Sequence, residues 1–258
     1  MKVLAIIGSP RKGHTYHIVQ QIERQMAQVP GMEFEYVFLS QLNLQPCRGC
    51  YVCQSRGEQY CPIKDDLPVL VQKLQEADGV IFASPAYTGN VPALVKNLMD
   101  RMAYTAHRPA FLGKPAMLVA TASSITADTL KALGWFRYTG FEIVSKLGIP
   151  VWPSPRTQWT GEEGTNRQIK KAAARFERAL AHPPASLSLE NVLQFYLMKT
   201  TAMTDPKFFA ADYEYHQELP MPASWWKKSL GQVVYWVVMK WMGNHIAPVR
   251  KDKIASSA

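Results

Sequence analysis

The sequence has few cysteines, a shortage of acidic side chains and no hydrophobic run long enough to cross a bilayer. All four cysteines fall between positions 47 and 61, so no disulfide framework extends along the chain. The apolar core of the C-terminal segment, Leu230 to Met239, spans ten residues, whereas a membrane-spanning helix needs about 20. Lys and Arg number 29 against 20 Asp and Glu, and the net charge of +9 favours anionic partners.

Recognisable targeting signals are also missing. Only five apolar residues, 3–7, precede Gly8 and Pro10, position 2 is not glycine, and no cysteine stands at the C-terminus. We therefore expect a cytoplasmic protein, and clustered cysteines in that reducing compartment indicate metal-binding or redox thiols. Nucleic acid is not an expected partner, because the basic residues are scattered and no binding motif accompanies them.

The spacing of the four cysteines suits one metal centre. Cys47, Cys50 and Cys53 are separated by two residues each, and Cys61 follows seven residues later, directly before Pro62. Three closely spaced thiolates can converge from one side of a loop while the fourth returns from the other, as a [4Fe-4S] cluster requires. A zinc site and an empty set of thiols remain alternatives, although the absence of an accompanying histidine favours an all-thiolate site.

Strand-like and helix-like periodicities alternate over the first 185 residues. This order predicts an α/β fold, with a doubly wound five-stranded parallel sheet and helices on both faces. Ligands of such sheets bind outside the carboxyl ends of the strands. The expected strands are 3–7, 34–39, 79–83, 116–121 and 149–152, and the expected helices are 15–28, 67–77, 91–104, 126–147 and 165–180.

The loop after the first strand, Gly8-Ser9-Pro10-Arg11-Lys12-Gly13-His14-Thr15, has the chemistry of a phosphate site. It offers two hydroxyls, a guanidinium and the backbone amides of a following helix. It matches neither the dinucleotide fingerprint nor the Walker pattern, so a single terminal phosphate fits better than a pyrophosphate or triphosphate. The alternative is a polar turn in which a hydroxyl caps the helix.

The loop after the third strand, Ser84-Pro85-Ala86-Tyr87-Thr88-Gly89-Asn90, precedes a helix that contains Lys96, Asp100 and Arg101. Together with the phosphate loop, this sequence resembles the flavodoxin-like NAD(P)H-dependent FMN reductases. With CRGCYVC and CPIKDD between the two loops, the chain is most similar to the iron–sulfur flavoprotein branch. The resemblance covers about residues 1–180.

The resemblance implies a role for each matching position. Ser9, Arg11 and Thr15 would hold the FMN phosphate, and His14, which replaces a small amide, would donate a hydrogen bond or face solvent. Tyr87 would stack on the flavin ring or else lie in the core. The expected cofactor-binding residues are Ser9, Arg11, His14, Thr15, Pro85, Ala86, Tyr87, Thr88, Gly89, Asn90, Thr121, Ala122 and Ser123, and the expected metal ligands are Cys47, Cys50, Cys53 and Cys61.

Three further expectations concern the surroundings of these loops. Thr121, Ala122 and Ser123 stand where the family has a glycine-rich turn near the flavin pyrimidine. Asp100 and Arg101 are interpreted as an ion pair on the surface of their helix. The aromatic residues of the interval 125–146, Trp135, Phe136, Tyr138 and Phe141, would cover the flavin or fill a subunit contact.

The composition changes after Pro183-Pro184, and we place a domain boundary there. Residues 1–184 form the expected FMN-binding domain with its cysteine loop at 47–61, and residues 185–258 form a helical extension. Helices are expected at 187–203, 206–217 and 224–242. The aromatic and lysine-rich third helix would contact another subunit of a homo-oligomer or lie peripherally on a membrane, with packing against a subunit the favoured alternative.

The resemblance implies an FMN-dependent oxidoreductase that passes electrons between NAD(P)H or a ferredoxin-type donor and an undefined acceptor, with a [4Fe-4S] cluster as a second centre. No side chain is assigned as catalytic, because hydride transfer from NAD(P)H to a flavin needs no side-chain acid or base. Two alternatives stay open: a non-enzymatic flavodoxin-like electron carrier, and an NAD(P)H:quinone or FMN reductase whose cysteine loop is empty.

Overall fold

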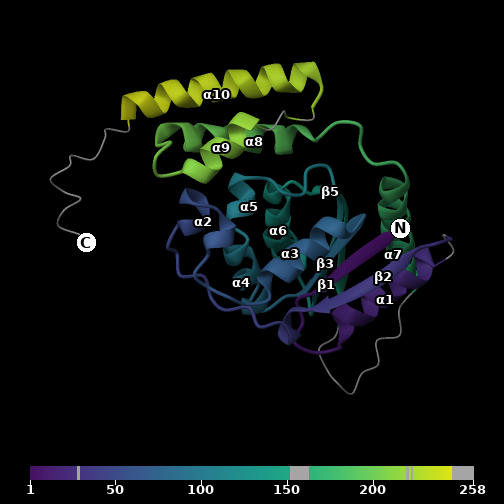
Figure 1. Cartoon of the computed structure of the whole chain (residues 1–258). Coiled ribbons are helices and arrows are strands. Elements are labelled where there is room, and N and C mark those ends of the chain that lie inside the picture. The colour runs from purple at the N-terminus through teal and green to yellow at the C-terminus, as the bar shows by residue number, and fades with distance from the viewer. Residues whose placement is uncertain (28–29, 152–162, 219–220, 222, 246–258) are drawn as a thin grey trace.

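The computed structural model of the chain describes residues 1–27, 30–151, 163–218, 221 and 223–245. Its centre is a five-stranded parallel sheet with the strand order β2-β1-β3-β4-β5 (Figure 1). This doubly wound order confirms the predicted flavodoxin-like α/β fold, and it places the switch point between β1 and β3. The strands are β1 (Lys2–Ile7), β2 (Glu33–Phe38), β3 (Gly79–Pro85), β4 (Pro115–Ala122) and β5 (Glu142–Pro150).

Helices cover both faces of the sheet, and each face has its own apolar cluster. Alternate residues of β1 divide between the two clusters. Leu4 and Ile6 pack with α3 (Leu67–Glu76) and α4 (Ala93–Arg101), whereas Val3, Ala5 and Ile7 pack with α1 (His14–Met26) and α7 (Glu163–Ala181). A strand that is buried on both faces is apolar throughout its sequence, and this confirms the strand predicted at 3–7. The helices of this unit are α1 (His14–Met26), α2 (Val52–Ser55), α3 (Leu67–Glu76), α4 (Ala93–Arg101), α5 (Tyr104–His107), α6 (Ala127–Leu133) and α7 (Glu163–Ala181), with short 3₁₀ turns η1 (Leu39–Gln41), η2 (Glu58–Tyr60) and η3 (Gly134–Thr139).

The prediction for residues 126–152 was wrong in its boundaries. The expected long helix ends at Leu133, and the fifth strand begins at Glu142 rather than at Ile149. Gly140 separates the two because its φ of 106° lies in the left-handed region, and a Cβ there would come within 2.8 Å of the Leu112 amide nitrogen. Residue 152, the last of the expected strand, lies outside the described residues.

Two of the four aromatic residues of this interval lie in the core, where they cannot cover a flavin. The side chains of Phe136 and Phe141 are fully buried in the core. Phe136 stacks on Phe82 of β3 with ring centroids 3.7 Å apart, and Phe141 stacks on Phe111 at 4.6 Å. Both expected roles, flavin cover and subunit contact, are therefore wrong for these two residues. Burying each phenylalanine instead stabilises the fold by about 2–3 kcal/mol.

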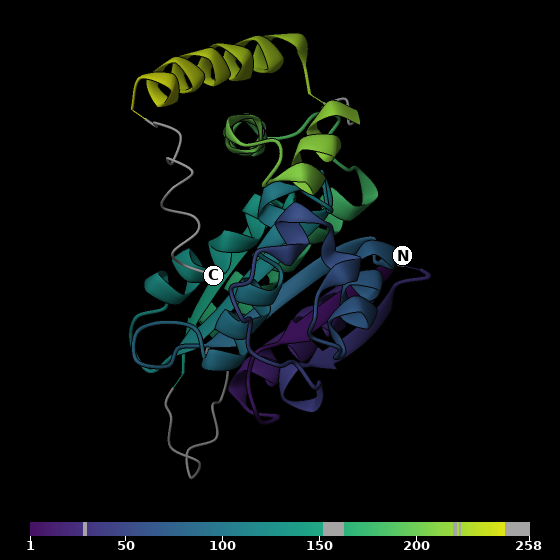
Figure 2. The same ribbon diagram turned by 60° about the vertical axis from the view of Figure 1, so that its left-hand side comes forward.

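The C-terminal extension forms three helices as predicted, α8 (Leu189–Thr204), α9 (Ala210–Glu218) and α10 (Trp225–His245). Ser188 caps α8 by accepting a hydrogen bond from the Asn191 amide. Phe195, Tyr196 and Met221 belong to a small apolar cluster of the extension. Figure 2 shows α8 and α9 between the sheet unit and α10, which is the outermost layer. In the described part of the chain no helix is both long and apolar enough to cross a membrane.

Candidate functional site

Three loops follow the carboxyl ends of β1, β3 and β4, which are neighbours in the sheet. Hydrogen bonds tie these loops together. The hydroxyls of Thr15 and Thr121 lie 2.7 Å apart in a buried position, and the Ala86 amide donates to the Thr121 carbonyl at 2.7 Å. The three segments predicted to bind FMN therefore meet at one edge of the sheet, and Thr121 connects the other two.

The phosphate loop is a tight turn that ends at the beginning of α1. The buried Ser9 hydroxyl donates to the Arg11 carbonyl at 2.8 Å and accepts from the Arg11 amide at 3.3 Å. Gly13 occupies the cap of α1, and no side chain accepts a hydrogen bond from the first turn. The alternative of a hydroxyl-capped turn is therefore not observed. The first-turn amides have no partner within the helix and, with the exposed Arg11, form a region that favours an anion.

The loop after β3 ends in a two-residue hairpin turn. Tyr87 and Asn90 exchange two backbone hydrogen bonds of 2.7 and 3.0 Å, and the central residues Thr88 and Gly89 have φ values of 51° and 71°. Positive φ at both positions is the geometry of a type I′ turn. Glycine adopts it readily, whereas a threonine there is strained.

The ring of Tyr87 stands on the surface, with 46% of the residue exposed. It is therefore available to a planar ligand, and the alternative of a core tyrosine is wrong. The remaining predicted residues differ in exposure: Pro85, Ala86 and His14 are half-buried, Ala122 is buried, and Thr88, Gly89, Asn90 and Ser123 are exposed.

All four cysteines line a single cavity of about 1060 Å³ that lies beside the cysteine segment rather than over the three loops. Cys47 and Cys50 are exposed, and Cys53 and Cys61 are half-buried. The Gly49 amide donates to the Cys47 sulfur at 3.4 Å. The chain turns sharply here, because Gly49, Tyr51 and Gly57 all have positive φ.

The thiols share an environment, although they do not converge on a point. Burial raises the pKa of the Cys53 thiol to about 11, the charge of Arg108 opposes this, and the three other cysteines add to the rise. Within the described ranges, no three His, Cys, Asp or Glu side chains are placed to hold a metal ion. The donor set of four cysteines is all sulfur, which fits an iron–sulfur cluster, and a single zinc ion can take the same four thiolates.

Arg101 anchors the chain on both sides of the cysteine segment. Its buried guanidinium binds Asp65 through two hydrogen bonds and donates to the Gln45 carbonyl at 2.8 Å. The predicted surface pair between Asp100 and Arg101 is therefore wrong, since Asp100 pairs with Lys96 instead. Asp100 and Arg101 both belong to α4, the helix after the Tyr87 turn, so one helix joins the loop after β3 to the two ends of the cysteine segment.

Asp65, which directly precedes Asp66 and helix α3, carries a buried carboxylate. Burial alone would raise its pKa, but hydrogen bonds from Arg101 and from the Gln45 and Leu67 amides hold the pKa below its usual value. The charged form is therefore the stable one in the folded protein. The repeated aspartates before a helix are a local signal for this position, whereas nothing local indicates its arginine partner.

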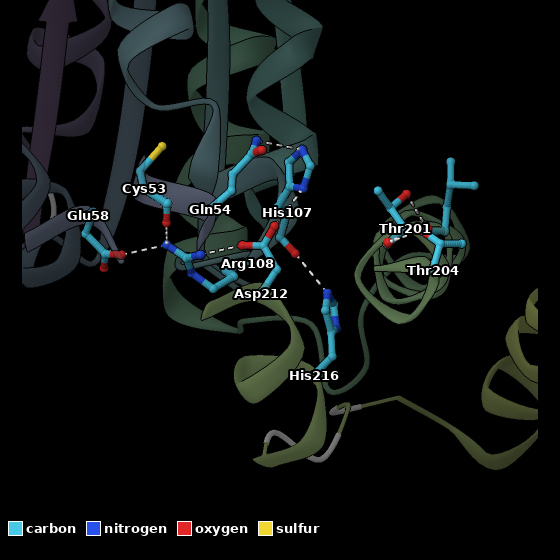
Figure 3. A network of polar contacts seen from close by, with 10 residues as sticks. Cys53, Gln54, Glu58, His107, Arg108, Thr201, Thr204, Asp212 and His216 are labelled. Atoms are coloured by element: carbon cyan, nitrogen blue, oxygen red, sulfur yellow. Dashed lines mark hydrogen bonds and ion pairs between the residues drawn. The ribbon is translucent and has the colours of Figure 1, made fainter. Parts of the chain in front are cut away.

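A second buried arginine joins the cysteine segment to the C-terminal extension (Figure 3). The Arg108 guanidinium donates to the Cys53 carbonyl at 2.9 Å, to Glu58 at 2.6 Å, and to Asp212 of α9. His107 Nδ1 also lies 3.0 Å from the Asp212 carboxylate. Through Arg108, the extension therefore holds the backbone at Cys53 in place. Sequence periodicity could not show this connection.

His216 of α9 completes this network. Its Nε2 lies 3.0 Å from the His107 carbonyl, and the residue is 2% exposed (Figure 3). Burial lowers the pKa of His216 from 6.5 to about 4, although the hydrogen bond to His107 and the Asp212 charge oppose the shift. The imidazole is thus neutral in the folded protein at neutral pH.

This lowered pKa predicts acid sensitivity. Below pH 6.5 the unfolded chain takes up a proton that the folded chain does not, so the stability present above pH 6.5 is lost as the pH falls toward 4. The loss amounts to about 3 kcal/mol in the free energy of unfolding. Denaturant unfolding at pH 7 and pH 5 should show a smaller difference for His216→Gln than for the unchanged protein. His182→Gln, at an exposed histidine, should keep the full difference. If the free energy of unfolding changed equally between pH 7 and pH 5 in all three proteins, the lowered pKa of His216 would be contradicted.

Comparison with known proteins agrees with this geometry. The sequence matches the NADPH-dependent FMN reductase family over residues 1–142, more than half of the chain. It is 40% identical over 179 residues to an iron–sulfur flavoprotein of Methanosarcina thermophila, covering 66% of this chain and 93% of that protein. Identity to iron–sulfur flavoprotein MJ1083 of Methanocaldococcus jannaschii is 44% over 102 residues, 39% of this chain and 51% of that protein.

A solved structure shows the same fold at low sequence identity. RosB, crystallised with 8-demethyl-8-formylriboflavin-5′-phosphate, superposes with a TM-score of 0.54 at 13% identity, covering 85% of this chain and 88% of RosB. The sequence match and the arrangement of the loops lead to one conclusion: the chain belongs to the NADPH-dependent FMN reductase family, in the branch of the iron–sulfur flavoproteins.

Proposed function

We propose that this protein is an FMN-dependent oxidoreductase that passes electrons between NAD(P)H, or a ferredoxin-type donor, and an acceptor, and that its four cysteines hold a [4Fe-4S] cluster. The observation that carries the proposal is the cavity shared by all four thiols, beside a segment that α4 ties to the flavin loop. Two cofactor regions are thus fixed by one helix.

The residues of the three loops would contact different parts of FMN. Arg11 and the first-turn amides of α1 supply positive charge and donors for a terminal phosphate. Thr15 and Ser9 shape that turn, and their hydroxyls are already engaged within the protein. Tyr87 offers an exposed ring against which a flavin ring would stack.

The cysteine segment would supply four thiolates to the cluster, and two arginines, each already paired with a carboxylate, hold the backbone around it. Arg101 lines the cavity, and Arg108 donates to the Cys53 backbone. The Gly49 amide hydrogen bond to Cys47 further stabilises negative charge on that sulfur. When bound, FMN exchanges electrons in pairs or singly and an iron–sulfur cluster exchanges them singly, which would let the protein join two-electron and one-electron partners.

Anaerobic stopped-flow mixing tests the enzymatic proposal. Protein-bound flavin should lose its visible absorbance on mixing with NADPH or NADH, while free FMN under the same conditions serves as the control. A flavin that dithionite reduces but neither nucleotide reduces would contradict NAD(P)H as the donor, and would favour a ferredoxin-type donor or the electron-carrier alternative. Iron analysis distinguishes the remaining alternative, an FMN reductase with an empty cysteine loop, because that protein would reduce its flavin but contain no iron.

A further inference from the structure

The helix α10 presents a broad apolar surface to solvent. Trp226, Leu230, Val233, Val237 and Trp241 follow one another at intervals of three or four residues, which places them on one side of the helix. These residues are between 40% and 62% exposed. Two more tryptophans, Trp225 and Trp236, widen the surface, and they are 79% and 65% exposed. Scattered exposed apolar residues are ordinary, but seven on one helix, five of them aligned, mark an interaction site.

The opposite side of α10 packs against α8 and cannot turn outward. Gly231 lies so close to Tyr196 that a Cβ at this position would come within 2.2 Å of the tyrosine ring. Lys227 is held as well, because its ammonium donates to the Leu187 carbonyl at 2.5 Å. The helix is therefore fixed with its tryptophan-rich side outward, at the outer edge of the molecule (Figure 2).

The charge of α10 indicates what kind of partner its apolar surface would bind. Its sequence from Trp225 to His245 contains three lysines and no aspartate or glutamate. Lys228 and Lys240 are exposed, in the first and in the fifth turn. Tryptophans beside an apolar stripe and lysines without counter-charges are the composition of helices that lie in the headgroup region of anionic bilayers.

A second copy of the chain fits this surface less well. Two α10 helices packed face to face would bring lysines toward lysines, and neither helix offers a carboxylate to pair with them. Anionic headgroups supply the missing charge, and the acyl region accepts the tryptophan and valine side chains. We propose that α10 is a monotopic membrane anchor that lies flat on an anionic lipid surface. This proposal goes beyond the redox function and does not depend on either cofactor.

Flotation of the purified full-length protein with liposomes tests the proposal. The protein should rise with vesicles of phosphatidylglycerol and phosphatidylcholine, and much less with phosphatidylcholine alone. Val233→Glu combined with Val237→Glu places two carboxylates on the exposed stripe and should lower the bound fraction by roughly tenfold or more. Val69→Glu, at an equally exposed valine of α3, is the matched control and should float like the unchanged protein.

The flavin spectrum and thermal unfolding of each variant confirm that it is folded. Two results would overturn the proposal. One is unchanged protein that stays in the dense fraction with anionic vesicles. The other is a stable dimer in solution that the double substitution, but not Val69→Glu, converts to monomer, since α10 would then be a contact between subunits.

Discussion

Replacing Cys53 by serine is expected to remove iron and acid-labile sulfide from the protein while FMN stays bound. The Cys53 side chain lines the cavity that it shares with Cys47, Cys50 and Cys61. A serine hydroxyl is a poor ligand for iron, so three remaining thiolates would not retain a cluster of the [4Fe-4S] type. We expect a fall from about four irons per chain to less than about one, measured on anaerobically purified protein.

The control for this substitution lies on the same short helix. Ser55 of α2 is half-buried, and its hydroxyl donates to the Val52 carbonyl at 3.4 Å, so Ser55→Ala perturbs α2 without touching a thiol. It should keep its iron. Iron that survives in Cys53→Ser, or zinc in place of iron in the unchanged protein, would contradict the cluster assignment. Loss of FMN together with the iron would show instead that α2 is needed for the fold of the flavin site.

Substitution of Arg11 by alanine is expected to weaken FMN binding and to leave riboflavin binding unchanged. Arg11 is exposed beside the first turn of α1, where no side chain satisfies the helix amides. A charge-assisted hydrogen bond to phosphate contributes about 1.5–3 kcal/mol, so the Kd for FMN should rise roughly tenfold to a hundredfold. Riboflavin has no phosphate, and its Kd should therefore stay the same.

Lys12 provides the matched control, because it is the neighbouring exposed cation. Its ammonium lies 5.7 Å from the centre of the Tyr16 ring and 5.6 Å from that of Phe38. Lys12→Ala should therefore change the Kd for FMN by less than about threefold, an effect below 1 kcal/mol. Titration of the apoprotein by flavin fluorescence measures both variants. Equal weakening of FMN and riboflavin by Arg11→Ala would mean that the loop had lost its shape, and would remove the support for a phosphate site.

The buried strands and the loops at their ends could be predicted because their signals are local. Val3 to Ile7 is apolar throughout, as a strand covered on both faces must be, and the polar loops begin where these runs end. The fifth strand could not be placed, because it lies at the sheet edge and mixes buried with exposed positions. Its aromatic neighbours looked like a surface feature in sequence, yet Phe136 and Phe141 are fully buried.

The anchors of the cysteine segment could not be predicted for a different reason. Arg101 lies 36 residues from its partner Asp65, and Arg108 lies 104 residues from Asp212. Sequence periodicity carries no information about pairs at such separations, because they form only when the fold brings distant elements together. Arg101 is the last residue of α4 and Arg108 directly follows α5, and at such helix ends an exposed arginine is the ordinary expectation. Their burial shows that α4, α5 and α9 together hold the segment that carries the thiols.

Helix α4 connects the loop after β3 with the cysteine segment. Its N-terminal end follows the Tyr87 turn, and its C-terminal Arg101 fixes Gln45 and Asp65 on either side of the cysteines. Asn97 of the same helix donates to the Leu44 carbonyl at 2.8 Å. In the proposed arrangement, this helix would keep the separation of the flavin and the cluster constant, which suits electron transfer between fixed centres.

The central claim is that one chain carries two redox centres, an FMN at the three loops and an iron–sulfur cluster at the cysteines. Its most direct test is the flavin, iron and sulfide content of anaerobically purified protein, read with its visible spectrum. We predict FMN in equal amount to the chain, about four irons with matching acid-labile sulfide, and broad absorbance that extends beyond the flavin bands. A protein that contains flavin but neither iron nor sulfide, when purified and reconstituted without oxygen, would contradict the claim.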